Sequence, residues 1–530
     1  MAQLSIRAQL HNGESTEFAA ELRAGETRFT LPLSGTLRAV TARMPLALSA
    51  GEKIFMNGFQ SWTACPEYGP GDSIRSLRRL PKAAVSHFGI DRYGDYYFVD
   101  YPDKKGMTHG VSYCYFRLGE RFRLLASLDE TAGYTLFAYD ANTGELSIRR
   151  DCEGLCVDGD FAAFDLFFAE GSEDEVFDAW FAAMGVSCRT REKIAGYSSW
   201  YDRYENISEY TIRADLSGCA GVLSAGDFFQ IDDGWEENVG DWLEPDREKF
   251  PHGMKFLSDE IHARGLRAGL WLAPFAASRR SRLFSEHPDW FFRHDGRPWY
   301  AGMTWGGFYA LDFDHPEVRA YLQKVFARVF DEWGFDLVKL DFLYAAAPCG
   351  SACETRAGRM RRAMEFLREL CGDRLILGCG VPLMPAFGLV DYCRVGCDMT
   401  LDWDNNLLMR HTNRERPSTR LSIANTVFRR ELNGRAFLSD PDVFFLRENN
   451  LKLTEEQKLT VATVNALFGG VYFCSDNMGR YDLEKRALYR RLLETRGAEG
   501  IRVDADTPGL VSVTYELGGV HKLLKLKNLI

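Results

Sequence analysis

The pattern of apolar and polar residues changes near residue 194, and the change separates two kinds of structure. Before it, short stretches alternate in polarity and end in Gly, Asn or Asp, as in residues 27–44 (TRFTLPLSGTLRAVTARM). Alternation with a period of two is typical of strands with one buried face. We therefore expect residues 1–170 to form an N-terminal β-sandwich domain.

A helical pattern follows this domain. Residues 172–185 (SEDEVFDAWFAAMG) begin with Ser and acidic residues and then space apolar side chains three to four positions apart. A capping residue followed by acidic residues marks the start of a helix, and the spacing gives the helix one apolar face. We expect residues 171–193 to form a linker helix.

Between residues 194 and 496, short apolar runs alternate with longer stretches of helical periodicity. Eight runs have the character of strands: residues 194–200, 226–232, 267–273, 336–342, 374–380, 392–398, 435–440 and 471–476. The helix after the fifth run is barely visible in the pattern. Strict alternation of eight strands with helices predicts an α/β fold, a catalytic (β/α)8 TIM barrel. An open doubly wound sheet is the alternative, but no G-x-G-x-x-G follows the first strand. Residues 497–530 predict a small C-terminal β-strand segment.

Composition and charge narrow the classes of function. The 530-residue chain is 46% hydrophobic and 26% charged, as in ordinary soluble globular proteins. Its formal net charge of −11 argues against a nucleic-acid partner, because nucleic-acid binding requires concentrated Lys and Arg. No apolar run is long enough to span a membrane, and the first residues lack the apolar core of a secretory signal.

The thirteen cysteines are spread along the chain in an odd number, as expected for reduced thiols. Three pairs have the spacing C-x3-C: Cys152 with Cys156, Cys349 with Cys353, and Cys393 with Cys397. None has a histidine beside it, whereas a zinc site requires a full set of ligands. We expect a cytoplasmic protein without a metal ion or another cofactor.

The residues at the ends of the predicted barrel strands are acidic and aromatic. In a TIM barrel the carboxyl ends of the strands carry the active site. At these ends the chain has Trp200, Tyr201, Asp202, Asp232, Asp233, Trp235, Trp271, Lys339, Asp341, Cys379, Gly380, Arg394, Asp398, Asp440 and Asp442. The set contains no histidine, so a metal-dependent hydrolase is disfavoured. Carboxylates with tryptophans favour sugar chemistry, in which acids hold hydroxyls and indole rings cover the apolar face of a pyranose.

Lys339 and Asp341 stand two positions apart in the fourth predicted strand and so point to the same face. Burying two charges is costly unless they are paired or used. They are therefore either a structural ion pair or part of a site. Glycoside hydrolysis requires two carboxylates across the scissile bond. Asp341 and Asp398 are the candidates, with Asp232 and Asp233 as competitors for the same roles.

Several longer motifs occur in a fixed order across this region. They are FFQIDDGWEENVGDWLEPDREKFPHGMKFLSDEIHARGLRAGLWLAPF, YALDFDHPEVRAYL, LVKLDF, LILGCGVPL, CRVGCD and FLSDPDVFFLR. In content and order they resemble the glycoside hydrolase family 36 α-galactosidases, and the resemblance extends to the β-rich N-terminal region. It implies a hydrolase that releases terminal α-linked galactose from oligosaccharides of the melibiose or raffinose type.

The resemblance also implies a mechanism. The K-x-D of VKLDF matches the nucleophile strand of the family, so Asp341 would attack the anomeric carbon and form a covalent glycosyl-enzyme. The R-x-G-x-D of CRVGCD matches the acid/base segment, so Asp398 would protonate the leaving oxygen and later activate water. Two displacements give net retention of the α configuration.

The contacts of the sugar follow from the same resemblance. Asp232 and Asp233 would hold the 4- and 6-hydroxyls, and Lys339 would reach the 3- and 4-hydroxyls. Arg394 and Cys379 would lie beside the 2-hydroxyl. The other expected substrate-binding residues are Gly380, Trp271, Trp200, Tyr201 and Trp62, the last in a loop (NGFQSWT) by which the N-terminal domain can close the pocket.

Structural alternatives remain open for five of these residues. They are Asp233 as a helix N-cap, Asp232 as the structural partner of Lys339, Trp271 as barrel filling, Cys379 as a packing residue, and Trp62 as part of the β-domain core. Functional alternatives are an α-N-acetylgalactosaminidase, an α-galactosyl transferase, or a catalytically inactive sugar-binding barrel. The C-terminal β domain of the family is usually larger than residues 497–530, which leaves a homo-oligomer open.

Overall fold

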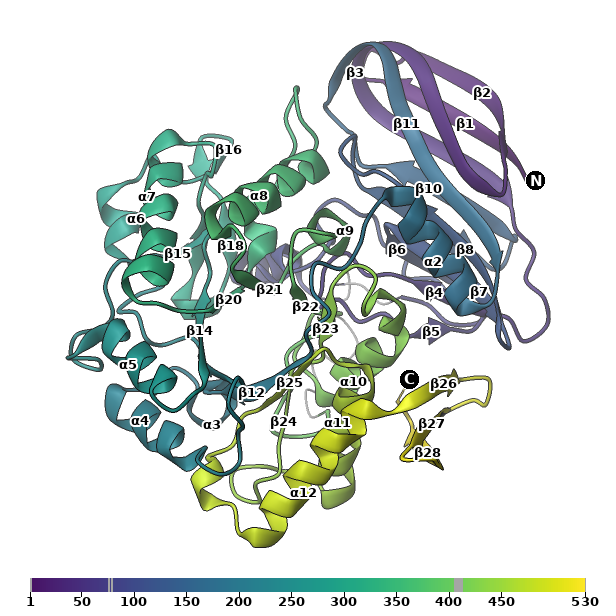
Figure 1. The fold of residues 1–530 in the computed structure, drawn as a ribbon. Coiled ribbons are helices and arrows are strands. Elements are labelled where there is room, and N and C mark those ends of the chain that lie inside the picture. Colours follow the sequence, from purple (N-terminus) through teal and green to yellow (C-terminus); the bar gives the residue numbers. More distant parts are fainter. Residues whose placement is uncertain (1, 75–76, 78–79, 405–412, 530) are drawn as a thin grey trace.

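The structure is a computed structural model that describes residues 2–74, 77, 80–404 and 413–529. These residues form an antiparallel β domain, a ring of parallel strands surrounded by helices, and a small sheet near the C-terminus (Figure 1). The N-terminal residues lie at the outer edge of the β domain, far from the ring (Figure 1). The ring carries the strand ends at which the sequence predicts chemistry.

Eleven antiparallel strands form the N-terminal domain within the described residues. They are β1 (Ala2–Leu10), β2 (Ser15–Leu22), β3 (Gly25–Pro45), β4 (Lys53–Met56), β5 (Glu67–Tyr68), β6 (Met107–Val111), β7 (Tyr113–Leu118), β8 (Arg121–Ser127), β9 (Thr135–Asp140), β10 (Glu145–Arg150) and β11 (Cys156–Gly171). In β3, Phe29, Leu31 and Leu33 are buried while the residues between them are exposed, as alternation predicts. The first half of β3 pairs with β11 and the second half with β10, so two halves of the sheet enclose one apolar core. The domain is the β-sandwich that the pattern predicts.

Helix α2 (Glu173–Met184) follows the sandwich and packs against its strands. The Ser172 backbone N–H donates to the Glu175 carboxylate at 2.9 Å, which satisfies a donor at the helix start. The helix ends at Gly185, whose φ of 64° is the left-handed conformation that glycine adopts at little cost. The buried indole of Trp180 donates to the Ser127 carbonyl of β8 at 2.9 Å. Apolar spacing and these two caps together account for the helix.

Eight parallel strands form the ring in the described residues, each inside one of the eight runs that the pattern predicts. They are β12 (Ile194–Ser198), β13 (Phe228–Ile231), β14 (Arg267–Leu272), β20 (Leu337–Leu340), β21 (Leu375–Gly378), β22 (Tyr392–Arg394), β23 (Leu438–Asp440) and β25 (Val471–Cys474). The seventh strand is interrupted at Pro441 and Asp442 and continues as β24 (Val443–Phe444). Because β23 pairs with β22 and β24 pairs with β25, the sheet closes on itself as a TIM barrel.

Helices cover the outside of the ring (Figure 1). Those that connect or follow the strands are α4 (Glu209–Gly218), α5 (Gly253–His262), α7 (Pro316–Ala327), α8 (Arg356–Cys371), α9 (Leu383–Ala386), α10 (Thr419–Phe428), α11 (Glu455–Phe468) and α12 (Leu483–Glu494). Helix α9, after the fifth strand, is a single turn of 4 residues. Its shortness explains why the periodicity barely reveals it.

Two excursions reach the carboxyl ends of the barrel strands, and the apolar pattern indicates neither. One lies between β14 and α7 and contains α6 (Arg282–Glu286) with the strands β15 (Ala276–Ser278), β16 (Arg293–His294), β17 (Arg297–Pro298), β18 (Tyr300–Gly302) and β19 (Phe308–Ala310). The other leaves the β-sandwich between β5 and β6 and contains α1 (Lys82–Phe88). A short helix, α3 (Trp200–Arg203), directly follows β12 at the same side of the ring.

Three strands complete the chain: β26 (Glu499–Asp504), β27 (Leu510–Leu517) and β28 (Val520–Lys527). They form an antiparallel sheet, the small β segment expected there. Asp506, in the turn after β26, accepts a hydrogen bond from Arg117 of β7 at 2.8 Å, which links this sheet to the N-terminal domain. All thirteen cysteines are free thiols, Cys349 and Cys353 among them. In the described part of the chain, no helix has the length and apolar character needed to cross a membrane.

Candidate active site

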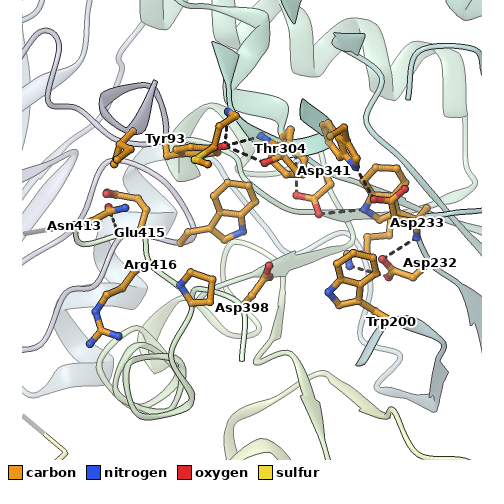
Figure 2. Close-up of a pocket in the computed structure, with 18 of the residues that line it drawn as sticks. Tyr93, Trp200, Asp232, Asp233, Thr304, Asp341, Asp398, Asn413, Glu415 and Arg416 are labelled. Carbon is orange, nitrogen blue, oxygen red and sulfur yellow. Dashed lines mark hydrogen bonds and ion pairs between the residues drawn. The ribbon is translucent and has the colours of Figure 1, made fainter. Parts of the chain in front are cut away.

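A cavity of about 480 Å³ opens at the carboxyl ends of the barrel strands. It is lined by Trp62, Phe88, Ile90, Tyr93, Trp200, Asp232, Asp233, Trp271, Met303, Thr304, Trp305, Lys339, Asp341, Phe342, Asp398, Asn413, Glu415, Arg416 and Pro417. Figure 2 shows Asp232 and Asp233 at one end, Asn413, Glu415 and Arg416 at the other, and Asp341 and Asp398 between them. The cavity therefore joins residues from distant parts of the sequence.

Lys339 on β20 and Asp341 directly after it reach this cavity from the same face, as strand alternation predicts. The Lys339 ammonium lies 2.9 Å from the Asp232 carboxylate at the end of β13. Burial alone would lower the pKa of Lys339, but the carboxylates of Asp232 and Asp341 raise it above its usual value. The lysine therefore stays charged in a place where it is only 7% exposed. The structural pairing of Asp232 with Lys339 is real, and both residues also line the cavity.

The Asp341 carboxylate is held by two N–H donors. The Phe342 backbone N–H donates to one oxygen at 2.8 Å, and the Trp271 indole donates to the other at 3.2 Å. Phe342 has a φ of 53°, a left-handed conformation that is costly for a bulky side chain. Backbone strain next to Asp341 thus accompanies a fixed carboxylate orientation. Trp271 lines the cavity as well as the barrel interior, so its role is not limited to filling the interior of the barrel.

Asp398, four residues after Arg394, occupies a different electrostatic environment. Arg394 donates to it at 2.9 Å, but the same guanidinium also bonds Asp440 at 2.9 Å and Asp442 at 3.0 Å. Burial raises the pKa of Asp398 to about 6; Arg394 opposes the rise, and the charges of Asp442 and Asp341 add to it. A carboxyl with a raised pKa therefore faces the same cavity as Asp341.

Asp232 and Asp233 follow β13 directly. The Trp305 indole donates to Asp233 at 2.8 Å, and burial together with the neighbouring Glu236 raises the pKa of Asp233 well above its usual value. The next helix after Asp233 begins only at Gly253, so the interpretation of Asp233 as a helix N-cap is wrong. Both aspartates present carboxylate oxygens to the cavity. These oxygens can accept hydrogen bonds from the hydroxyls of a polyhydroxylated ligand.

Trp62 comes from the N-terminal domain and yet lines the cavity. Its indole donates to the Cys379 thiol at 3.3 Å, and the neighbouring Ser61 backbone N–H donates to the Val381 carbonyl at 2.9 Å. A Cβ at position 380 would lie 2.9 Å from the Trp62 ring, so this ring position requires Gly380. Trp62 is thus docked against the barrel rather than confined to the β-domain core.

Four residues expected at the sugar lie behind the cavity wall instead. Cys379 and Gly380 support Trp62, Arg394 supports Asp398, and the Tyr201 hydroxyl donates to Asp442. None of the four is among the residues that line the cavity. The other eight expected residues line it, Trp200 included.

The sequence did not indicate the residues of the two excursions. Trp305 has a φ of 56° and is followed by two glycines, a local sequence (TWGG) that predicts only a turn. The Tyr93 hydroxyl bonds the Thr304 hydroxyl at 2.9 Å and accepts from the Met303 backbone N–H at 3.0 Å. This contact joins the two excursions across 211 residues of sequence. An aromatic residue directly before two glycines is the one local signal available for Trp305.

The arrangement suits a two-carboxylate reaction on a sugar. Asp341 directly follows β20 and Asp398 lies in the segment after β22; both face one cavity, and indole rings and acidic acceptors surround them. Among the described residues, no group of three or more His, Cys, Asp or Glu side chains is arranged to hold a metal ion. The groups available for chemistry between the two catalytic candidates and the strand ends are therefore carboxylates, one lysine and aromatic rings.

Comparisons with known proteins agree with this geometry. The Melibiase family model matches residues 204–367. The α-galactosidase TtGalA from Thermus thermophilus, solved with stachyose, has 30% sequence identity and a TM-score of 0.71, over 88% of this chain and 99% of that one. The α-galactosidase Mel36A of Lactobacillus acidophilus is 31% identical over 122 residues, which is 22% of this chain and 16% of that protein. The A type blood α-D-galactosamine galactosaminidase of Flavonifractor plautii is 35% identical over 137 residues, 24% of this chain and 12% of that protein. The chain thus matches less than a fifth of the length of these two curated proteins.

Proposed function

Since the chain belongs to glycoside hydrolase family 36, we propose that it is an α-galactosidase that releases terminal α-linked galactose with retention of configuration. The observation that carries this proposal is the pair of carboxylates in one cavity. Asp341 is oriented by two N–H donors, and the pKa of Asp398 is raised to about 6. A nucleophile and a proton donor need two such different environments.

The reaction follows from these two roles. Asp341 attacks the anomeric carbon, the glycosidic bond breaks, and Asp398 gives its proton to the departing oxygen. A covalent galactosyl-enzyme and a free alcohol result. Asp398, now ionised, takes a proton from water, whose oxygen attacks the anomeric carbon and releases Asp341. Two inversions at the same carbon leave the α configuration unchanged.

The sugar contacts are part of the same proposal. Asp232 and Asp233 accept hydrogen bonds from the 4- and 6-hydroxyls, and Lys339 donates to the 3- and 4-hydroxyls. Trp271 and Trp200 border the ring. The proposed binding site also includes six cavity residues that lie outside the barrel strands: Trp62, Tyr93, Met303, Thr304, Trp305 and Phe342. Arg394 acts through Asp398, Cys379 and Gly380 act through Trp62, and Tyr201 acts through Asp442.

Substrates of the melibiose or raffinose type fit this proposal, because the cavity continues past Asp341 and Asp398 toward Asn413 and Arg416 (Figure 2). TtGalA has been solved with stachyose, an oligosaccharide. The local match to a galactosaminidase keeps an α-N-acetylgalactosaminide as the second candidate substrate.

The test compares the wild-type enzyme with Asp341→Ala on nitrophenyl α-galactoside and on nitrophenyl α-N-acetylgalactosaminide. We expect the wild type to hydrolyse the galactoside, and the variant to lose at least about 10³-fold in rate, as for loss of a covalent nucleophile. The first product observed by NMR should be α-galactose. If the wild type is as inert as the variant on both substrates, the proposal fails; if only the N-acetyl substrate reacts, the second candidate replaces it.

A further inference from the structure

A network of three carboxylates around one guanidinium lies behind the cavity, and the mechanism above uses only one of its members. Arg394 is 3% exposed at the end of β22. Its Nη1 donates to Asp398 at 2.9 Å, its Nε to Asp440 at 2.9 Å, and its Nη2 to Asp442 at 3.0 Å. A single positive charge is therefore shared among three acids.

Asp442 is held in this network with unusual firmness. The Met399 backbone N–H donates to its Oδ2 at 2.9 Å, the Tyr201 hydroxyl donates to the same oxygen, and the Val443 backbone N–H donates to its Oδ1 at 2.9 Å. Its φ of 74° lies in the left-handed region, in the interruption between β23 and β24. The backbone adopts a sparsely populated conformation there, and the side chain does not line the cavity.

We propose that Asp442 is a positioning residue for the acid/base step: it competes with Asp398 for the guanidinium of Arg394, and so keeps Asp398 able to hold a proton. The inference rests on the proposed function, because it concerns the proton that Asp398 gives to the leaving oxygen. Without a competitor, an arginine 2.9 Å from Asp398 would hold that carboxyl in its ionised form.

The groups that face Asp398 determine the direction of the effect. Arg394 ends β22 on the same segment as Asp398, Asp442 follows β23, and Lys339 on β20 is joined by Asp341 directly after that strand. The Tyr201 and Tyr204 hydroxyls and the Cys379 thiol are also close enough to interact with it. Burial is the largest cause of the raised pKa of Asp398; Arg394 and Lys339 lower it, and Asp442 and Asp341 raise it. Removing the charge of Asp442 lowers the pKa of Asp398 for two reasons: a like charge disappears, and Arg394 has one anionic partner fewer.

The experiment measures the pH dependence of kcat/KM for raffinose in the wild type, Asp442→Asn and Asp440→Asn. The alkaline limb reports the pKa of the acid in the free enzyme. Asn tolerates a positive φ, so the backbone at 442 is preserved. We expect the alkaline limb of Asp442→Asn to move to lower pH by about one unit. At a given pH on that limb, kcat/KM should therefore fall about tenfold below that of the wild type. Asp440→Asn is the matched control: it also relieves the guanidinium of one carboxylate, but Asp442 is among the principal charges acting on Asp398 and Asp440 is not, so its limb should move in the same direction by less.

Dinitrophenyl α-galactoside gives the second measurement. Its leaving group needs little protonation, so Asp442→Asn should shift the limb for raffinose and leave the limb for this substrate nearly unchanged. A uniform loss of rate without a shift, or equal shifts in the two variants, overturns the inference. If Asp442→Asn does not fold, Tyr201→Phe replaces it, because this variant keeps the charge of Asp442 and removes one of its hydrogen-bond donors. The alkaline limb of Tyr201→Phe should move to higher pH. No movement, or movement to lower pH, overturns the inference. A wild type inert on both substrates would instead refute the proposed function.

Discussion

The two ends of the cavity are built in different ways. At the barrel end, which we define as Asp232, Asp233, Trp271 and Lys339, the side chains come from β13, β14 and β20 or directly follow them. They are between 2% and 7% exposed and bonded to one another or to neighbouring polar atoms.

The loop end, which we define as Phe88, Ile90, Tyr93, Asn413 and Arg416, comes from an excursion of the β-sandwich and from the segment before α10. Phe88 is 42% exposed, and α1, which carries it, has no buried residue. Under the proposed function, the residues that would face the galactose are all buried parts of the barrel, whereas those that would face the leaving group combine a buried residue, Arg416, with an exposed one, Phe88. Substitutions at the two ends should therefore differ in size and in kind.

The largest effect is expected from Lys339→Met, at the barrel end. The substitution leaves the Asp232 carboxylate buried without its cation, and breaking a buried pair in this way costs about 3–5 kcal/mol. We expect a lower midpoint of thermal unfolding and a loss of at least about 100-fold in kcat/KM. Calorimetry and kinetics on nitrophenyl α-galactoside measure the two losses.

The double variant Asp232→Asn with Lys339→Met is the control for that result. It removes both charges, so it should regain most of the stability and none of the activity. If Lys339→Met is as stable and as active as the wild type, the barrel end is not the coupled structure described above, and the contrast with the loop end disappears.

The difference between the two ends also decides what the sequence could predict. Lys339, Asp341 and Asp232 stand out because charges interrupt apolar runs of strand length, and alternation then fixes the face to which they point. The TIM barrel itself followed from eight such runs. Nothing comparable marks Tyr93 or Phe88, because their excursion has no period and its place is set by contacts with residues more than 200 positions away.

Arg394 shows a second limit of the sequence. Its motif and its position at a strand end were visible, but its guanidinium faces three carboxylates rather than the cavity. A strand of 3 residues, β22, does not reveal from the pattern which of its polar side chains points inward. The positions of Cys379 and Gly380 could not be predicted for a similar reason: both contact the Trp62 ring, which belongs to another domain.

Trp305→Phe tests the boundary between the two ends, with an intermediate effect. Trp305 belongs to an excursion, yet its indole donates to Asp233 at 2.8 Å. The phenyl ring keeps most of the apolar surface and removes the donor, and a hydrogen bond to a charged or buried group contributes about 1.5–3 kcal/mol. We expect kcat/KM for nitrophenyl α-galactoside to fall about 10- to 100-fold with little change in the unfolding midpoint.

Trp299→Phe is the matched control, since Trp299 lies in the same excursion and does not line the cavity. Its kinetics should stay close to those of the wild type. Equal losses in the two variants would mean that the excursion acts as a whole, through its packing, and that the bond from Trp305 to Asp233 has no separate role.

The smallest effect is expected from Phe88→Ala, at the loop end. Because Phe88 is already 42% exposed, its removal should leave the unfolding midpoint unchanged. A sugar beyond the scissile bond would cover the remaining part of the ring, which is worth about 0.5–1 kcal/mol of apolar burial. We therefore expect kcat/KM for raffinose to fall about threefold and that for α-galactosyl fluoride, which carries no second sugar, to stay the same.

Leu483→Ala serves as the control, because Leu483 is 87% exposed on α12 and outside the cavity. An equal loss on both substrates would place the effect of Phe88 on the galactose itself, and the two ends of the cavity would then no longer divide recognition between them.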